Sequence, residues 1–169
     1  CLWPNPGQTK WSVKSQGKQL NGYMALAASV KRAIEEGLEL YEPAVLAKLT
    51  KKDLKKIFRG QGEIPLLEER LRHAHEIGNA LLNHWGGDFV NMLKAAEGSA
   101  VSLVESVLEH FPCFDDVTIY RGREVKFYKR AQILPVDLMG GMRNESLVQF
   151  HDIGELSAFA DYKIPQVLQ

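Results

Sequence analysis

The stretch PLLEERLRHAHEIGNALLNHWGG, residues 65–87, carries the longest helical pattern in the chain. Its apolar residues recur three or four positions apart, which places them on one face of an α-helix. These residues are Leu67, Leu71, Ala74, Ile77 and Leu81. Proline is favoured in the first turn of a helix and glycine ends helices, so the pattern predicts a helix that begins near Pro65 and ends before Gly86.

Capping residues on both sides of this stretch predict further helices. Asn21 precedes a helical pattern that Gly37 closes, with apolar positions at Tyr23, Leu26, Ala27, Val30 and Ile34. Thr50 and Asp53 resemble a capping box for a short helix before Gly60, and Asp88 and Ser99 are suited to cap two more.

The sequence also predicts two helices in the C-terminal part of the chain and two hairpins, one near each end. KRAQILPVDLM (129–139) and DIGELSAFADY (152–162) have helical patterns, with Asp152 and Glu155 placed as cap and third-position partner. Residues 11–20 and 117–128 alternate around Gln16-Gly17 and Arg121-Gly122, which indicates tight hairpins. The prediction is a single helical domain over residues 1–169, mainly α, with one or two short β-hairpins and no internal repeat.

Composition limits the partners and the location of the protein. Among its 169 residues, Lys plus Arg and Asp plus Glu both count 21, so bulk charge does not favour a stable nucleic-acid partner. No apolar run reaches the roughly 18 residues of a membrane span. Two cysteines without metal-ligand spacing favour a reducing, cytoplasmic location. The start at Cys1 and the stop soon after Pro165 predict the central part of a longer chain.

Two places in the sequence are candidates for chemistry. Asp161 lies in an apolar turn, where a carboxylate is either a buried structural acceptor or a group held at a pocket wall. Lys129 and Arg130 lie at a strand-to-helix junction, where cations bind a phosphate or pair with acids. The histidines show no ligand spacing, so no metal site is predicted.

Four segments, GYMALAASVKRAIEEGL, EIPLLEERLR, FYKRAQIL and FADYKIPQVL, closely resemble the queuosine salvage family in order and spacing. The resemblance implies a helical fold similar to that of helix-hairpin-helix DNA glycosylases. It also implies a nucleotide N-glycosidase that hydrolyses queuosine 5′-phosphate and releases queuine for salvage into tRNA modification. The implied partner is this small nucleotide, and no metal or redox cofactor is implied.

The family's functional residues carry over onto matching positions. The resemblance implies that Asp161 is the catalytic aspartate, that Lys129 contacts the 5′-phosphate and that Phe159 lies against the base. Tyr162 and Asp137 are further candidates for substrate binding. Pro135, two residues before Asp137, departs from the family pattern.

Two other functions stay open at this point. One is a DNA or RNA base glycosylase that flips a base from a strand. The other is an inactive helical fragment that serves as a binding or scaffold module. Within the leading hypothesis, Asp161 acts as nucleophile, as base for water or as an electrostatic stabiliser.

Overall fold

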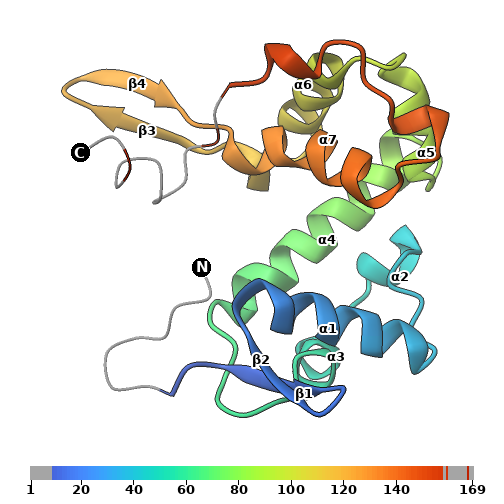
Figure 1. Cartoon of the computed structure of the whole chain (residues 1–169), viewed down its shortest axis with the longest axis vertical. Helices are drawn as coiled ribbons and strands as arrows, with labels where there is room; N and C mark the ends of the chain where they lie inside the picture. The colour runs from blue at the N-terminus through green and yellow to red at the C-terminus, as the bar shows by residue number, and fades with distance from the viewer. Residues whose placement is uncertain (1–8, 158, 160–166, 168–169) are drawn as a thin grey trace. The chain divides into compact units, whose positions relative to one another are not determined.

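The computed structural model describes residues 9–157 together with residues 159 and 167 (Figure 1). The chain divides into two compact units, Cys1–Asn83 and His84–Gln169. The described residues are mainly α-helical with two antiparallel hairpins, as the sequence predicts. No helix among them is long and apolar enough to cross a membrane.

Within the described part of unit 1, from residue 9 on, a hairpin is followed by four helices. Figure 1 labels these elements. Gln16 and Gly17 both have positive φ, which is the turn that matches the twist of a two-residue hairpin. Thr50 and Asp53 form the predicted capping box at the start of the third helix. The elements are β1 (Ser12–Ser15), β2 (Lys18–Asn21), α1 (Gly22–Glu35), α2 (Pro43–Leu46), α3 (Lys51–Ile57) and α4 (Leu67–His84).

The α4 helix confirms the pattern of residues 65–87. It begins at Leu67 because Leu66 adopts a left-handed φ of +58° and cannot join the helix. Its N-terminal apolar residues, Leu67, Leu71 and Ala74, pack against the unit 1 core of Ala33, Leu49, Leu54 and Ile57. The prediction that this face is a packing face is therefore confirmed for the first half of the helix.

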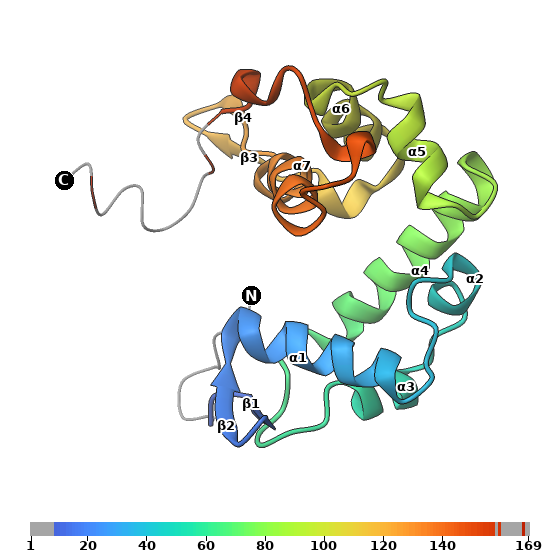
Figure 2. The same cartoon turned by 45° about the vertical axis from the view of Figure 1, so that its right-hand side comes forward.

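The α1 helix covers the hairpin with a face that the sequence pattern did not single out (Figure 2). Its buried residues are Ala25, Ser29 and Ala33, each one position before an apolar residue of the predicted face. Consecutive residues differ by about 100° around a helix, so the predicted face is rotated partly away from the core. Tyr23 is consequently 68% exposed and Ile34 40% exposed. Of the residues on this face, Leu26 still packs against the core at its edge.

Trp11 connects the hairpin to the end of α3. It is 1% exposed, its Nε1 donates to the Phe58 carbonyl at 2.9 Å, and the two rings meet edge to face. The adjacent Ser12 pairs with Gln61 through two backbone hydrogen bonds of 3.0 and 2.9 Å. These contacts fix the segment after α3 against β1.

Unit 2 contains three α-helices, three short 3-10 helices and the second hairpin, within the part of the chain that the structure describes. Its core comes mainly from α6, where Leu103 is fully buried, and from Val148 of the second 3-10 helix. The elements are α5 (Phe89–Ala95), α6 (Ala100–His110), η1 (Pro112–Phe114), β3 (Val117–Tyr120), β4 (Arg123–Lys126), α7 (Lys129–Gly141), η2 (Ser146–Val148) and η3 (Ile153–Glu155).

Asp152 does not cap the helix that the sequence predicted for residues 152–162. Residues 158 and 160–162 of this stretch lie outside the described residues, and the described ones form only the short η3, which the Asp152 side chain does not cap. The carboxylate instead accepts hydrogen bonds from Ser99 Oγ at 2.5 Å and from the Ala100 backbone N–H at 2.6 Å. The exposed N–H groups and positive dipole end of α6 attract the carboxylate more strongly than a single 3-10 turn does.

This arrangement predicts a sensitivity to acid. The Ser99 hydroxyl, helped by the Ala100 N–H, lowers the pKa of Asp152. A carboxyl whose pKa is lower in the folded state contributes stability above its unfolded pKa of roughly 4 and loses it as the pH falls through the folded pKa. Thermal unfolding between pH 6 and 2 should therefore show a steeper acid loss for the unmodified protein than for Asp152→Asn. Identical acid profiles would contradict this role.

Candidate functional site

The candidate site in unit 2 is the start of α7, which follows β4 after two residues. Tyr128 precedes the helix with a left-handed φ of +47° and makes no side-chain cap. The helices α3, α5 and α6, by contrast, have side-chain caps from Thr50, Asp88 and Ser99. Tyr128 therefore leaves the first N–H groups of α7 without a side-chain cap of its own, and N–H groups at a helix start attract anions.

The two cations at this helix start have different surroundings. Arg130 lies 3.6 Å from Asp116, and its guanidinium is 5.3 Å from the Phe114 ring centroid. These contacts attach α7 to the segment between η1 and β3, so Arg130 has a structural role. Lys129 is the first residue of the helix and is half-buried.

Gln132, in the first turn of α7, connects this helix to the segment after η3. Its Oε1 accepts hydrogen bonds from the Ser157 backbone N–H at 2.8 Å and from Ser157 Oγ at 2.9 Å. Its Nε2 donates to the Phe127 carbonyl at 3.1 Å. The Gln132 amide therefore links Phe127, which precedes α7, to Ser157, which lies 25 positions after Gln132.

This connection is important for the predicted catalytic segment. Ser157 lies four residues before Asp161, a length that spans at most about 14 Å even when fully extended. Ser157 is described and contacts α7, whereas Asp161 lies outside the described residues. The sequence analysis missed Gln132, although the motif FYKRAQIL contains it.

Some of the predicted site residues are described by the structure and others are not. Asp161 and Tyr162 lie outside the described residues, and Phe159 is half-buried. Asp137 is exposed and lies eight residues after Lys129, roughly 12 Å along the helix axis. The structure therefore does not bring Asp137 and Lys129 together. Pro135 is buried inside a continuous α7, so the helix accommodates it.

The structure also brings together side chains that the sequence spacing kept apart. The rings of His84 and His110 lie 4.5 Å apart between centroids, and Trp85 stacks on Phe111 at 5.7 Å. His110 Nδ1 is 2.9 Å from the Ser106 carbonyl oxygen. Among the described residues, no group of three or more His, Cys, Asp or Glu side chains is arranged to hold a metal ion.

Comparison with known proteins shows the family of the chain. The model of the queuosine salvage protein family matches residues 1–169. The chain belongs to this family. It is 49% identical over 168 residues to the queuosine 5′-phosphate N-glycosylase/hydrolase of Sphaerobacter thermophilus, covering 99% of this chain and 51% of that protein.

Two animal proteins, both named queuosine 5′-phosphate N-glycosylase/hydrolase, are also similar. The relative from Nematostella vectensis is 41% identical over 169 residues, which are 99% of this chain and 49% of that protein. The relative from Bos taurus is 38% identical over 169 residues, which are 99% of this chain and 50% of that protein. The chain spans about half the length of the curated relatives it matches.

Proposed function

We propose that the protein hydrolyses the N-glycosidic bond of queuosine 5′-phosphate and releases queuine for tRNA modification. The observation that carries this function is membership of the queuosine salvage family over residues 1–169. The hydrogen bonds from Ser157 to Gln132 are consistent with it, because they attach Ser157 to the helix that begins with Lys129.

The chemistry of the proposed reaction accounts for a carboxylate at Asp161. Cleavage of an N-glycosidic bond develops positive charge on the ribose, as in the oxocarbenium-like transition states of glycoside hydrolysis. A carboxylate beside the sugar stabilises this charge, and the interaction is stronger where apolar side chains exclude water. Phe159 and the alanines next to Asp161 in the sequence are apolar, which suits such an environment.

The leaving base places more of the catalytic work on the sugar side. Queuine is a 7-deazaguanine and has carbon where a purine has N7, so protonation at N7 cannot activate it. Stabilisation of the ribosyl cation is then the main contribution available to the enzyme. A single dominant carboxylate, Asp161, fits this requirement.

The remaining site residues are proposed to bind the substrate. Lys129 and the uncapped start of α7 bind the 5′-phosphate, Phe159 lies against the flat base, and Tyr162 holds the position of Asp161. Asp137 is the weakest member of this set because it is exposed and two turns along α7 from Lys129.

The proposal includes the setting of the enzyme. It acts in the cytoplasm on a small nucleotide, without a metal or redox cofactor and without a stable nucleic-acid partner. The helical architecture is proposed to be of the helix-hairpin-helix glycosylase type, and the chain to form a single helical domain from the central part of a longer protein.

Lys129→Met should selectively weaken binding of the phosphorylated substrate. Loss of a charge-assisted hydrogen bond costs about 1.5 to 3 kcal/mol, and the dephosphorylated nucleoside should bind as before. Isothermal titration with both ligands measures the difference. Arg130→Met is the matched control, because that neighbouring cation already contacts Asp116 and Phe114. Equal losses on both ligands for Lys129→Met would rule out the phosphate assignment.

Gln132→Leu should reduce turnover about tenfold, the effect of losing roughly 1.4 kcal/mol of positioning energy. Leucine has similar size but cannot accept from Ser157. Gln132→Glu keeps an acceptor oxygen and should restore part of the rate. Single-turnover rates and melting temperatures of both variants separate positioning from folding. A rate loss that simply follows the loss of folded protein, without rescue by Glu, would count against the positioning role.

The decisive experiment is product analysis after incubation with queuosine 5′-phosphate. Release of queuine and a ribose 5-phosphate supports the proposal, with the Sphaerobacter relative as positive control. A parallel measurement of thermal protection by queuine shows whether the chain binds the product. Absence of both product and protection, while the relative is active under the same conditions, would refute the function for this chain.

A further inference from the structure

A pocket of about 460 Å³ in unit 1 is lined by basic and amide side chains, and no acid lines it among the residues that the structure describes. Its basic residues come from three elements: Lys14 from β1, Arg32 from α1 and Arg59 from the segment after α3. The rest of the lining is Gln19, Gly60 and Gln61. A second pocket, beside α3 and α4, is likewise lined by three basic residues, Lys51, Lys55 and Arg59. It differs in that three glutamates line it as well.

The pocket wall is held rigidly by backbone contacts. Ser12 and Gln61 exchange two backbone hydrogen bonds, which fix the segment Gly60–Gln61 against β1. The approach is close, because a Cβ added to Gly60 would lie 2.3 Å from the Ser12 carbonyl oxygen. The three basic side chains are therefore presented by elements that cannot easily separate.

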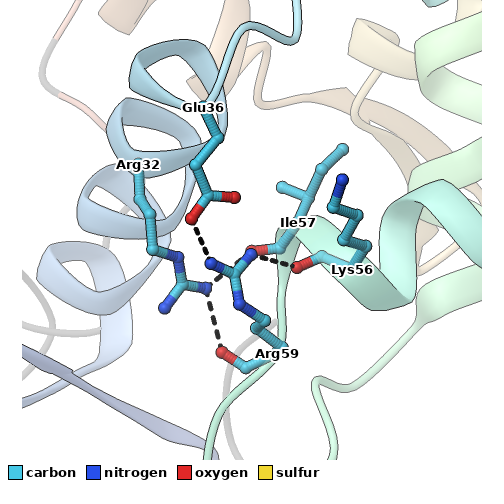
Figure 3. Close-up of polar contacts among 5 residues, drawn as sticks. All are labelled: Arg32, Glu36, Lys56, Ile57 and Arg59. Atoms are coloured by element: carbon cyan, nitrogen blue, oxygen red, sulfur yellow. Dashed lines mark hydrogen bonds and ion pairs between the residues drawn. The ribbon is translucent and has the colours of Figure 1, made fainter.

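Contacts with the protein account for only part of the hydrogen-bonding capacity of the two guanidinium groups (Figure 3). Arg32 Nη2 donates to the carbonyls of Ile57 at 2.9 Å and Arg59 at 3.0 Å. Arg59 donates to the Lys56 carbonyl at 2.9 Å and pairs with Glu36. The buried Nε of Arg32 has no hydrogen-bond partner among the described residues.

The charges around the pocket are unbalanced. Lys14, Arg32 and Arg59 contribute three positive charges, and Glu36, which pairs with Arg59, contributes one negative charge. Burial, with the nearby charge of Arg59, lowers the pKa of Arg32. An anion in the pocket would relieve this repulsion, since opposite charges stabilise one another most where solvent is partly excluded.

We propose that this pocket of unit 1 binds a phosphate group, either as free phosphate or as part of a small phosphorylated molecule. The planar guanidinium groups and the mobile ammonium of Lys14 are the side chains that proteins use for phosphate oxygens. The pocket volume falls in the range of small-molecule sites, so it also accommodates an organic portion. The neutral overall charge argues against a long polyanion.

The test is a titration of the protein with inorganic phosphate. Binding is measured from the NMR signals of the Arg32 and Arg59 Nε–H groups and of the Gln61 side-chain amide. We expect saturable shifts of these signals that weaken with added salt. Lys14→Met should weaken binding about fivefold, the effect of one unit charge at 4 Å in water. Lys18→Met, on the neighbouring strand of the same hairpin but outside the pocket, should leave the affinity unchanged.

Two further ligands identify the source of the phosphate. Adenosine should leave the Arg32 and Arg59 signals unshifted, whereas AMP should shift them. Binding of AMP more tightly than phosphate would show that the site takes a phosphorylated molecule, and equal affinity would show that it takes the phosphate group alone. Shifts that do not saturate, or equal losses for Lys14→Met and Lys18→Met, would overturn the proposal. Activity at Asp161 does not enter these measurements, so the proposed function can fail independently.

Discussion

Asp161→Asn is expected to lower turnover of queuosine 5′-phosphate by roughly 10² to 10³ while queuine still binds. Asparagine keeps the size of the side chain but removes its negative charge. The substitution therefore isolates the electrostatic contribution to the ribosyl cation from the shape of the site. The expected loss is the scale measured when an enzyme loses one strong electrostatic stabiliser of a transition state.

The same variant distinguishes the structural alternative for Asp161. If the carboxylate is only a buried acceptor, the change should appear as about 1 to 3 kcal/mol of lost stability with near-normal turnover in the molecules that fold. Asp115→Asn, which removes an exposed carboxylate at the end of η1, is the matched control and should change neither quantity. Melting temperature and single-turnover rate on one preparation decide between the two roles. A stable and active Asp161→Asn variant would end the catalytic assignment.

Gly78→Ala is expected to destabilise unit 1 by about 1 to 3 kcal/mol, the cost of overpacking a close contact. A Cβ at this position of α4 would lie 2.5 Å from the Ala47 backbone nitrogen and 2.6 Å from the Pro43 carbonyl oxygen. Both obstacles are backbone atoms of the α2 region, so no side chain can move aside to make room. The clash outweighs the gain in helix propensity from alanine, which is about 1 kcal/mol at most.

Gly140→Ala in α7 provides the matched control with the opposite sign. No atom of the described residues lies within 4 Å of a Cβ built at Gly140, so alanine should stabilise the helix by up to about 1 kcal/mol. Urea denaturation of the two variants measures both changes. Equal stabilisation by both substitutions would show that α4 and the α2 region do not approach as closely as the structure indicates.

Local signals predicted most of the secondary structure correctly. The capping box of Thr50 and Asp53, the caps at Asp88 and Ser99, and the positive-φ turns at Gln16-Gly17 and Arg121-Gly122 all form where the sequence places them. Each depends on residues no more than three positions apart. Such interactions are formed within one turn and do not require knowledge of distant neighbours.

Long-range choices could not be predicted in the same way. The apolar row of α1 identified an apolar face, but the buried residues of this helix are the small Ala25, Ser29 and Ala33. Ala25 packs with Trp11 and Val13 at the hairpin, and Ala33 packs with the core of Leu49, Leu54 and Ile57. Small side chains allow two backbones to approach closely, and hydrophobic periodicity does not detect that preference. Similarly, the Asp152 carboxylate accepts a hydrogen bond from Ser99 at the start of α6, 53 positions away, and does not cap the helix start in its own segment.

For the candidate site, the residues that carry the family resemblance, Asp161, Lys129 and Phe159 among them, could be read from the amino-acid sequence alone, because motifs are contiguous in the chain. The different surroundings of Lys129 and Arg130 became visible only in the tertiary structure, where Arg130 contacts Asp116. The same holds for the hydrogen bond between Gln132 and Ser157 and for the contact of Arg32 with Arg59, 27 positions apart. These contacts depend on hydrogen-bond donors and acceptors meeting at about 3 Å. Spacing along a chain does not specify such distances, because they arise only when separate elements pack together.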